Sequence, residues 1–418
     1  MLRRLTLPAM LAATMLATVS GAPASAASWK YLTLDGGGTV PGHVNTSVGP
    51  QSATASVNGV QHVIYQNRTT PSGVRHAYKT NSGWQIETID GLGGEDPATT
   101  GRQMGEYPSA VTLGSVLHAF YWDGSTRSLR HAYLIGSNWY LEYIDGIQAG
   151  YLGRTTNNVG SGSSAVVFNN QVHVFYSDNA TRSVRHAWYD GTTWSYEWLD
   201  GPVSVTPGRT LKNSGRTTAA GVDSAGCLLA VYDTYSSGLQ AIGVRVAKRC
   251  GNTWTFKNVD GANSNVAGRT TDPVGGSVAV AAYNNETHVF AHNTAKGDLR
   301  HMRFAGGAWT AENLDGPSST YPGRTTQTVG YRGVSTTVAG TALRVYYASV
   351  PISGSTLRQA MLSNGTWSFR MLDGVNGSSG SGFTDAGSYA TATTEGGRPV
   401  VYYSAYQGHS YLRRAELS

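Results

Sequence analysis

The chain has 418 residues, including 53 glycines, 24 tyrosines and 10 tryptophans, and its formal net charge is +6. Only six of its 31 basic residues are lysines and these are dispersed, so it lacks the lysine-rich arm of a nonspecific nucleic-acid binder. Beyond the N-terminus no segment approaches the roughly 20 apolar residues of a membrane-spanning helix, so neither nucleic acid nor a membrane is an expected partner.

The first 26 residues are typical of a secretory signal peptide. Arg3 and Arg4 supply a positive start, and a mostly apolar stretch follows from Leu5 to Val19. The tripeptide Ala24-Ser25-Ala26 then provides the small residues of a cleavage site. We therefore expect a secreted, extracellular protein in which residues 1–26 are removed and residues 27–418 form one domain.

Seven repeats account for the rest of the chain. A tryptophan followed six residues later by an Asp-Gly dipeptide recurs seven times, and an arginine stands nine residues before six of these tryptophans. The aspartates are Asp35, Asp90, Asp145, Asp200, Asp260, Asp315 and Asp373. The tryptophans are Trp29, Trp84, Trp139, Trp194, Trp254, Trp309 and Trp367, and the arginines are Arg75, Arg130, Arg185, Arg245, Arg300 and Arg358.

The second repeat shows how each unit divides into strands. Its segments Ser109–Leu113, Leu117–Tyr121, Leu129–Leu134 and Trp139–Asp145 are apolar or alternating, and tight Gly-bearing turns join the last three. Four-stranded units of about this length, repeated along a chain, are typical of a β-propeller. We therefore predict an all-β fold, a single seven-bladed β-propeller with four-stranded blades.

The seventh unit is split between the two ends of the chain. Its third strand, Leu412–Ala415, has no tryptophan and Asp-Gly after it, and the missing piece is Trp29–Gly36 at the other end. Pairing these segments closes the last blade with the N-terminal strand and leaves no open sheet edge between the termini. Arg413 then becomes the seventh arginine of the repeat.

The repeated arginines, aspartates and tryptophans are interpreted as structural, because a ligand site rarely needs seven identical copies. If the turn at Gly136-Ser137 centres the hairpin, Arg130 faces Tyr143 and lies diagonal to Asp145 on one face of the same sheet. We therefore expect seven buried or half-buried ion pairs within the blades. The tryptophans are expected to pack between blades.

Four of the seven units carry a His-His-Glu row across their second, third and fourth strands. The rows are His62, His76 and Glu87; His118, His131 and Glu142; His173, His186 and Glu197; and His288, His301 and Glu312. The other units lack all three members together, and unit four has Leu229, Val246 and Lys257 instead. We interpret each row as an internal hydrogen-bonded chain; zinc ligation and ligand contact are the alternatives. No metal and no other cofactor is predicted.

The loop from each fourth strand to the next unit contains a Gly-Arg or Gly-His dipeptide in six cases. Its charged members, His43, Arg102, Arg154, Arg209, Arg269 and Arg324, are the candidate binding residues. Loops of this class lie at one mouth of a propeller, where these side chains would form a ring of positive potential for an anionic partner. The alternative is that each arginine braces its own loop against carbonyls of a neighbouring blade.

No catalytic constellation is evident. The chain has no G-x-S-x-G, P-loop or H-E-x-x-H motif, and its acidic residues outside the repeats form no obvious pair for glycoside hydrolysis. The main irregular units are the Tyr-rich seventh and the fourth, which contains Cys227 and Cys250, and export makes a disulfide their expected state. We therefore expect a binding protein rather than an enzyme.

The L-R-H-A strand followed by a turn, a tryptophan and a closing Asp-Gly resembles the blades of bacterial seven-bladed propeller lectins. This resemblance extends over the whole mature chain and implies several weak glycan sites between blades. A second alternative is a polysaccharide lyase acting on an anionic polymer, since a ring of arginines could neutralise uronate charge.

The signal ending in Ala24-Ser25-Ala26, the seven repeats and the single-domain layout resemble the secreted actinobacterial dispase autolysis-inducing proteins. This resemblance implies a protein that binds a secreted thermolysin-like metalloprotease such as dispase and induces its autolysis. It also implies a glutamine donor for a secreted transglutaminase, which needs exposed, flexible side chains. The candidates in or beside predicted loops are Gln66, Gln148, Gln327 and Gln407.

Overall fold

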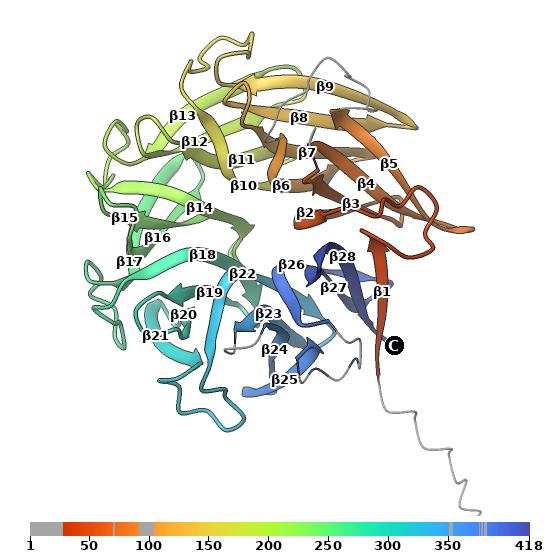
Figure 1. Cartoon of the computed structure of the whole chain (residues 1–418). Coiled ribbons are helices and arrows are strands. Elements are labelled where there is room, and N and C mark those ends of the chain that lie inside the picture. The colour runs from red at the N-terminus through yellow and green to blue at the C-terminus, as the bar shows by residue number, and fades with distance from the viewer. Residues whose placement is uncertain are drawn as a thin grey trace, which may run out of the picture.

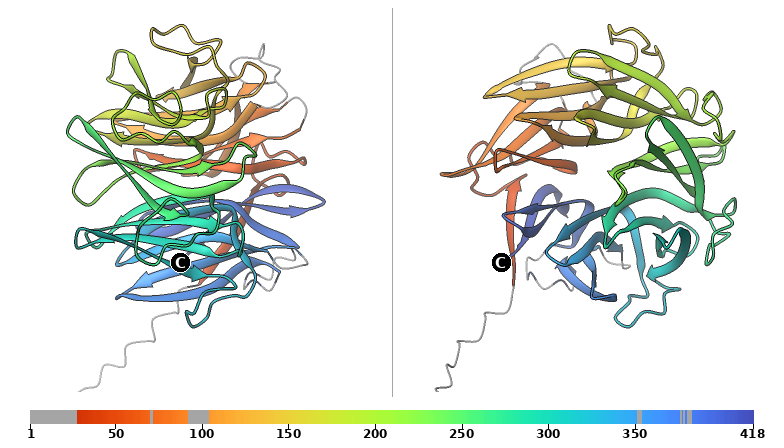
Figure 2. Two further views of the ribbon diagram at one scale, coloured as in Figure 1. Left: turned by 90° about the vertical axis from the view of Figure 1, so that its left-hand side faces the viewer. Right: turned by 180° about the vertical axis from the view of Figure 1, so that it is seen from behind.

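The computed structural model describes residues 28–69, 72–91, 104–350, 354–375, 377, 379 and 383–418. In these residues 28 strands form seven four-stranded antiparallel sheets. None of the described residues belongs to a helix that could span a membrane. The sheets follow one another around a central axis in chain order (Figure 1), and Figure 2 shows the ring from the side and from behind. The predicted seven-bladed β-propeller is thereby confirmed, whereas the expected signal peptide lies outside the described residues.

Each blade runs from an inner strand at the axis to an outer strand at the rim. The first three blades are β2 (Val48–Val57), β3 (Val60–Asn67), β4 (Gly73–Thr80) and β5 (Gly83–Gly91); β6 (Met104–Leu113), β7 (Val116–Asp123), β8 (Ser128–Ile135) and β9 (Asn138–Asp145); and β10 (Val159–Phe168), β11 (Gln171–Asp178), β12 (Ser183–Tyr189) and β13 (Trp194–Asp200). Blades four and five are β14 (Asn213–Val222), β15 (Leu228–Tyr235), β16 (Ala241–Cys250) and β17 (Thr253–Gly261); and β18 (Val274–Tyr283), β19 (Glu286–Asn293), β20 (Leu299–Ala305) and β21 (Ala308–Asp315). Blades six and seven are β22 (Thr328–Ala339), β23 (Ala342–Val350), β24 (Thr356–Ser363) and β25 (Thr366–Gly374); and β26 (Asp385–Glu395), β27 (Arg398–Gln407), β28 (His409–Leu417) and β1 (Trp29–Asp35).

The predicted strands of the second blade are confirmed, but its inner strand begins earlier than expected. Strand β6 starts at Met104 instead of Ser109, and its pairing with β7 is irregular between these two residues. Gly105 has a positive φ of 84° there, as a β-bulge requires. The bulge interrupts the alternation of buried and exposed residues, so the sequence pattern shows only the regular half of the strand.

The ring closes as predicted by pairing the two ends of the chain. Strand β1 lies antiparallel to β28, with Trp29 opposite Leu417 and Thr33 opposite Arg413. The inner strand β2 of the first blade also contacts the inner strand β26 of the last. Every blade therefore has a neighbour on both sides.

The hydrophobic core consists of clusters, most of which fill the space between adjacent blades. The outer-strand tryptophans belong to them, as predicted: Trp194 points its edge at Phe120 and His131 of the preceding blade, with ring centroids 5.9 and 5.5 Å away. Such edge-to-face contacts are worth about 0.5–1.5 kcal/mol beyond area burial. Burial between blades thus stabilises the ring as well as each sheet.

The expected disulfide joins Cys227, just before β15, to Cys250 at the end of β16. The adjacent residues Leu228 and Arg249 are paired in the ladder, so the disulfide closes the open end of this hairpin. A disulfide of this kind is typical of proteins from oxidising compartments.

Candidate functional site

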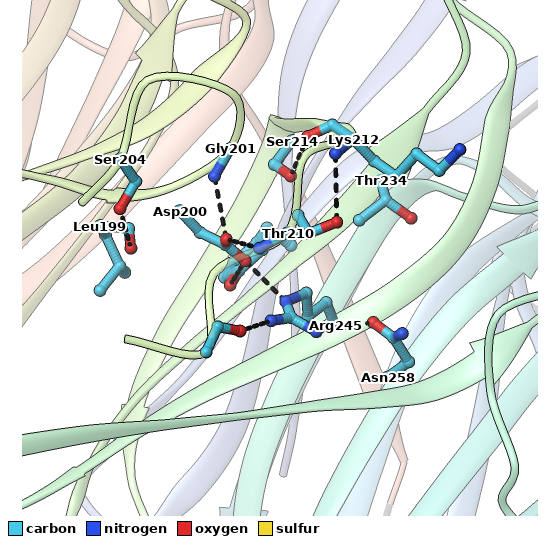
Figure 3. Close-up of polar contacts among 12 residues, drawn as sticks. Leu199, Asp200, Gly201, Ser204, Thr210, Lys212, Ser214, Thr234, Arg245 and Asn258 are labelled. Carbon is cyan, nitrogen blue, oxygen red and sulfur yellow. Dashed lines mark hydrogen bonds and ion pairs between the residues drawn. The ribbon is translucent and has the colours of Figure 1, made fainter. Parts of the chain in front are cut away.

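The arginine and aspartate of the repeat join neighbouring blades. Arg245 in β16 places its Nε 2.6 Å from Oδ2 of Asp200, which ends β13 of the preceding blade (Figure 3). The prediction of ion pairs was right, but their placement within one blade was wrong. A bulge before Arg130 shifts Asp145 out of diagonal register, and Arg130 pairs with Asp90 of the blade before it. The seven pairs are Arg75–Asp35, Arg130–Asp90, Arg185–Asp145, Arg245–Asp200, Arg300–Asp260, Arg358–Asp315 and Arg413–Asp373.

Five of these buried carboxylates also accept a backbone N–H from the loop that leads to the next blade, namely Asp35, Asp145, Asp200, Asp260 and Asp315. Oδ1 of Asp200 accepts hydrogen bonds from the backbone N–H of Gly201 at 2.9 Å and of Thr210 at 2.6 Å (Figure 3). Its Oδ2 also accepts the hydroxyl of Tyr232 at 2.6 Å. Burial raises the pKa of Tyr232 well above its ordinary value, so this phenol stays protonated and donates. One carboxylate therefore joins two blades and their connecting loop.

The Gly-Arg loops extend over the outer strand of the following blade. The Gly208 carbonyl accepts a hydrogen bond from Nη2 of the core Arg245 at 2.5 Å. A Cβ on Gly42 would lie 2.2 Å from the Ile86 carbonyl oxygen in β5, and one on Gly268 would lie 2.0 Å from that of Ala311 in β21. Close packing therefore requires glycine at Gly42 and Gly268, and the positive φ that these two share with Gly153, Gly208 and Gly323 favours glycine in each of these loops.

The candidate binding residues of these loops do not come together at the channel mouth. Nη1 of Arg154 donates to the Gly146 carbonyl at 3.1 Å, and Nη1 of Arg324 donates to that of Pro317 at 3.4 Å. The remaining candidates are placed as follows: Nδ1 of His43 donates to the Val40 carbonyl at 2.9 Å, Arg209 and Arg269 are exposed, and Arg102 lies outside the described residues. The expectation that these side chains form a ring at the channel mouth was therefore wrong for the described residues, and three of them brace their own loops.

The His-His-Glu rows are internal hydrogen-bonded chains. In the first blade His62 Nδ1 lies 2.8 Å from His76 Nε2, and His76 Nδ1 lies 2.8 Å from Glu87 Oε1. An ionised carboxylate can only accept a hydrogen bond, so His76 donates to Glu87 through Nδ1. The Nε2 of His76 then accepts a hydrogen bond from the Nδ1–H of His62. Glu87 also accepts the indole N–H of Trp139 from the second blade at 2.9 Å.

This geometry favours the structural interpretation over zinc ligation. Both nitrogens of the central His76 are engaged in hydrogen bonds, so that ring offers no free ligand atom. Burial lowers the pKa of His62 to about 4, and the hydrogen bond from His76 lowers the pKa of Glu87. No group of metal-ligating side chains is found among the residues that the structure describes.

A cavity of about 970 Å³ lies at the axial end of the ring where the inner strands begin. Its charged lining residues are Arg68, Arg216, Arg332 and Asp385, and its tyrosines are Tyr107, Tyr331, Tyr389 and Tyr406. Three arginines against one aspartate leave a net charge of +2 on the lining. Burial lowers the pKa of the one lining histidine, His292, which keeps it neutral. We call this site the mouth cavity.

Two of its arginines are held by carboxylates, and for the third, Arg68, no ion pair is found in the described part of the chain. Nη2 of Arg216 lies 3.3 Å from Oδ2 of the buried Asp233, and Nη1 of Arg332 lies 3.0 Å from Oδ2 of Asp385. Both remain more than a third exposed, at 37% and 39% of their side-chain surface. Arg68 follows β3 and is exposed. The cavity therefore presents positioned guanidinium groups to solvent.

Two tyrosines of the mouth cavity have a backbone conformation that disfavours a side chain. Tyr107 and Tyr389 occupy the same position in the bulged inner strands of the second and seventh blades, with φ of 53° and 54°. The equivalent residue of the third blade is Gly162, with φ of 62°. Burial, together with the charges of Glu106 and Tyr389, raises the pKa of Tyr107. Strain of this kind is typical of functional positions.

The mouth cavity was not predicted from the sequence, although the repeats contain a signal for it. The two residues after the glycine of each inner strand differ in every unit, whereas the framework around them is constant. These pairs are Pro50-Gln51, Glu106-Tyr107, Ser161-Gly162, Arg216-Thr217, Gly276-Ser277, Tyr331-Arg332 and Ser388-Tyr389. Only the structure reveals that the seven bulges are equivalent, and six of these pairs contribute at least one residue to the lining of the mouth cavity, whereas Ser161 and Gly162 of the third blade do not.

The candidate glutamines lie in different environments. Gln148 and Gln407 are exposed, and Gln327 is half-buried with its Oε1 accepting the Ser349 hydroxyl at 3.1 Å. Gln66 lies inside β3 rather than in a loop, is 4% exposed, and donates to the Met104 carbonyl at 3.0 Å. Gln66 therefore stands beside the end of its strand, as expected, but its side chain lacks the exposure that a glutamine donor needs.

No family model and no curated protein sequence matches the chain. Among solved structures it is similar to a Dyadobacter fermentans protein of unknown function, with 11% identity, a TM-score of 0.52, and coverage of 93% of this chain and 97% of that one. It is also similar to Trypanosoma rangeli sialidase in complex with sialic acid, with 12% identity, a TM-score of 0.48, and coverage of 94% and 59%. A fucose-specific lectin from Aleuria aurantia gives 16% identity, a TM-score of 0.47, and coverage of 78% and 96%. At such identities the likeness concerns the fold alone.

Proposed function

We propose that this chain is a secreted, non-enzymatic protein that binds a protein partner through the mouth cavity. The observation that carries this proposal is the clustering there of Arg68, Arg216 and Arg332 with exposed tyrosines. Tyr331, Tyr406 and Tyr389 expose 61%, 48% and 39% of their surface, respectively. Arginine and tyrosine are enriched in the hot spots of protein interfaces, where a few residues provide most of the affinity.

The net positive lining favours a partner with an acidic surface, and complementary charge also accelerates association. The resemblance to dispase autolysis-inducing proteins identifies the partner class as thermolysin-like neutral metalloproteases. In this proposal the partner contacts the mouth cavity, and the complex increases self-digestion of the protease.

The test is to mix the purified mature protein with thermolysin and to follow residual protease activity and new fragments over time. We expect faster loss of activity, and at least a tenfold weaker effect for Arg68→Glu and for Tyr331→Ala, as for hot-spot residues. Arg209→Glu, which makes the same charge change in a loop near the rim, is the matched control and should behave as the unchanged protein. An unchanged protease lifetime would overturn the proposal, and loss only in Arg209→Glu would move the contact surface to the Gly-Arg loops.

The second part of the proposal is that the chain is a glutamine donor for a secreted transglutaminase. The exposed Gln148 and Gln407 fit this role because the enzyme must draw the side chain into its own active site. The buried Gln66 does not fit it, since its amide is already bonded inside the sheet.

Glycan binding and polysaccharide cleavage have less support in the geometry. The repeated tryptophans and arginines that suggested several glycan sites lie mostly buried between blades, where they contact protein groups. The arginine ring that suggested a lyase is distributed near the rim. A glycan array, and absorbance of unsaturated products with uronate polymers, separate these alternatives from protein binding.

A further inference from the structure

The outer-strand tryptophan of each blade meets one position of the blade before it, the last member of the His-His-Glu row. In three interfaces a glutamate at this position accepts the indole N–H: Glu87 from Trp139 at 2.9 Å, Glu142 from Trp194 at 3.2 Å and Glu197 from Trp254 at 2.9 Å. At the interface of blades six and seven this position is Arg370, whose guanidinium lies 5.5 Å from the ring centroid of Trp29. In blade seven the position is Leu32, and Arg414 from the middle of the row lies 5.8 Å from the ring centroid of Trp84. At four interfaces the side chain at this position therefore interacts with the indole of the following blade, and at three of them it is a carboxylate.

At the interface between blades four and five, a lysine stands at this position. Ladder pairing of Val246 with Lys257 shows that Lys257 occupies the place of the glutamate. Its Nζ donates to the neutral side chain of Asn265 at 2.7 Å, and no ion pair of Lys257 is found in the described part of the chain. Trp309, the tryptophan of the fifth blade, is only half-buried, and its ring contact is with Phe304 of its own blade. Among the residues that the structure describes, neither a carboxylate nor a stacked cation is found at this indole.

A cavity of about 530 Å³ lies at this interface. Leu229, Val246 and Val266 are buried residues of its lining, with Phe256 and Phe304 at half-buried positions. Its second lysine, Lys248, is already paired with Asp223 at 2.5 Å, so Lys257 supplies the uncompensated charge. A volume of this size lies within the range of small-molecule sites, which are mostly apolar with a few placed polar groups.

We propose that this inter-blade cavity binds a free aliphatic or aromatic carboxylic acid. The carboxylate takes the place of the missing glutamate, where it accepts the indole N–H of Trp309 and pairs with Lys257. The hydrocarbon part lies on the apolar floor formed by Leu229, Val246 and Val266. The other interfaces of the same ring support this, since three of them contain the indole–carboxylate hydrogen bond that the ligand would restore.

The test is isothermal titration calorimetry of the mature protein with decanoate and, separately, with the neutral analogue decanol. We expect saturable one-to-one binding of decanoate, and at least about tenfold weaker binding of decanol, because hydrogen bonds and ion pairs to a charged group are lost. Lys257→Glu restores the glutamate found in four other blades, so it should fold and lose decanoate binding by at least about tenfold. Trp309→Phe keeps the ring, removes the N–H donor and should weaken binding by a smaller factor.

Lys212→Glu is the matched control, because it makes the same charge change at an exposed loop residue outside the cavity lining. It should bind decanoate as the unchanged protein does, and thermal melting of every variant reports that the propeller is intact. Absence of decanoate binding would overturn the proposal, and so would equal binding of decanol or full binding by a folded Lys257→Glu variant. Because the readout involves no protease, its outcome is independent of the proposed function.

Discussion

Replacement of Asp200 by alanine tests the role of the inter-blade carboxylates most directly. The change removes the acceptor of Arg245 Nε, of the Tyr232 hydroxyl and of two backbone N–H groups (Figure 3). Loss of one partner of a buried ion pair costs about 3–5 kcal/mol, because the other charge stays buried without compensation. Each backbone donor that loses its acceptor in the interior adds roughly 1 kcal/mol or more. We therefore expect the free energy of unfolding to fall by at least about 4 kcal/mol.

The assay is equilibrium unfolding in guanidinium chloride, followed by tryptophan fluorescence. Asp190→Ala is the matched control, since Asp190 is an exposed aspartate whose carboxylate accepts the backbone N–H groups of Thr192 and Thr193 at 2.8 and 2.9 Å. Its replacement removes similar turn hydrogen bonds without leaving a buried charge unpaired, so the free energy of unfolding should fall much less than for Asp200→Ala.

A double variant separates the buried charge from the lost hydrogen bonds. Asp200→Ala combined with Arg245→Met removes both charges, so it should be more stable than Asp200→Ala alone by about 2 kcal/mol. The reasoning is refuted if Asp200→Ala costs no more than Asp190→Ala. It is also refuted if the two changes at the ion pair are simply additive.

Three further outcomes follow from the structure. Burial lowers the folded-state pKa of the first histidine in each row to about 3 or about 4, while the unfolded chain takes up these protons near pH 6.5. The free energy of unfolding should therefore be greatest above that pH and decrease as the pH falls toward about 4, and a flat profile in denaturant titrations would contradict this. Replacement of Cys227 and Cys250 by serine opens a loop with a sequence separation of 23 residues and should cost about 3 kcal/mol in the same unfolding assay, whereas an unchanged midpoint would contradict the expected role. Transglutaminase labelling with a fluorescent primary amine, read by peptide mass spectrometry, should modify Gln148 and Gln407 and spare Gln66 in the folded protein, and labelling of Gln66 would refute the burial argument.

The sequence predicted the framework well, because the framework is repeated. The spacing of arginine, tryptophan and Asp-Gly gave the number of blades, and the incomplete last unit predicted the pairing of Trp29–Asp35 with the C-terminal strand. Hairpin registry also placed His76 beside Glu87 correctly, since partners within one sheet follow from local turns.

Contacts between blades could not be predicted from the sequence in the same way. Arg130 and Asp145 appear adjacent when the hairpin is drawn flat, but a bulge and the packing of the next sheet direct Arg130 to Asp90. The Gly-Arg loops were expected at the axis because the loops that join blades lie on that face. Their glycines instead pack on the outer strands, because the core arginines bind the glycine carbonyls there.

The sequence by itself therefore determined the ring and its closure, which rest on local periodicity and on the pairing of two recognisable ends. It also indicated the disulfide, because the chain has only two cysteines and a segment typical of export. Only the tertiary structure decided which repeated residues face a neighbouring blade and which variable ones meet at an opening. Arg68, Arg216 and Arg332 stand in three different blades and share no spacing, so only closure of the ring brings them to one cavity. Likewise, the inter-blade cavity beside Trp309 forms only when the fourth blade packs against the fifth.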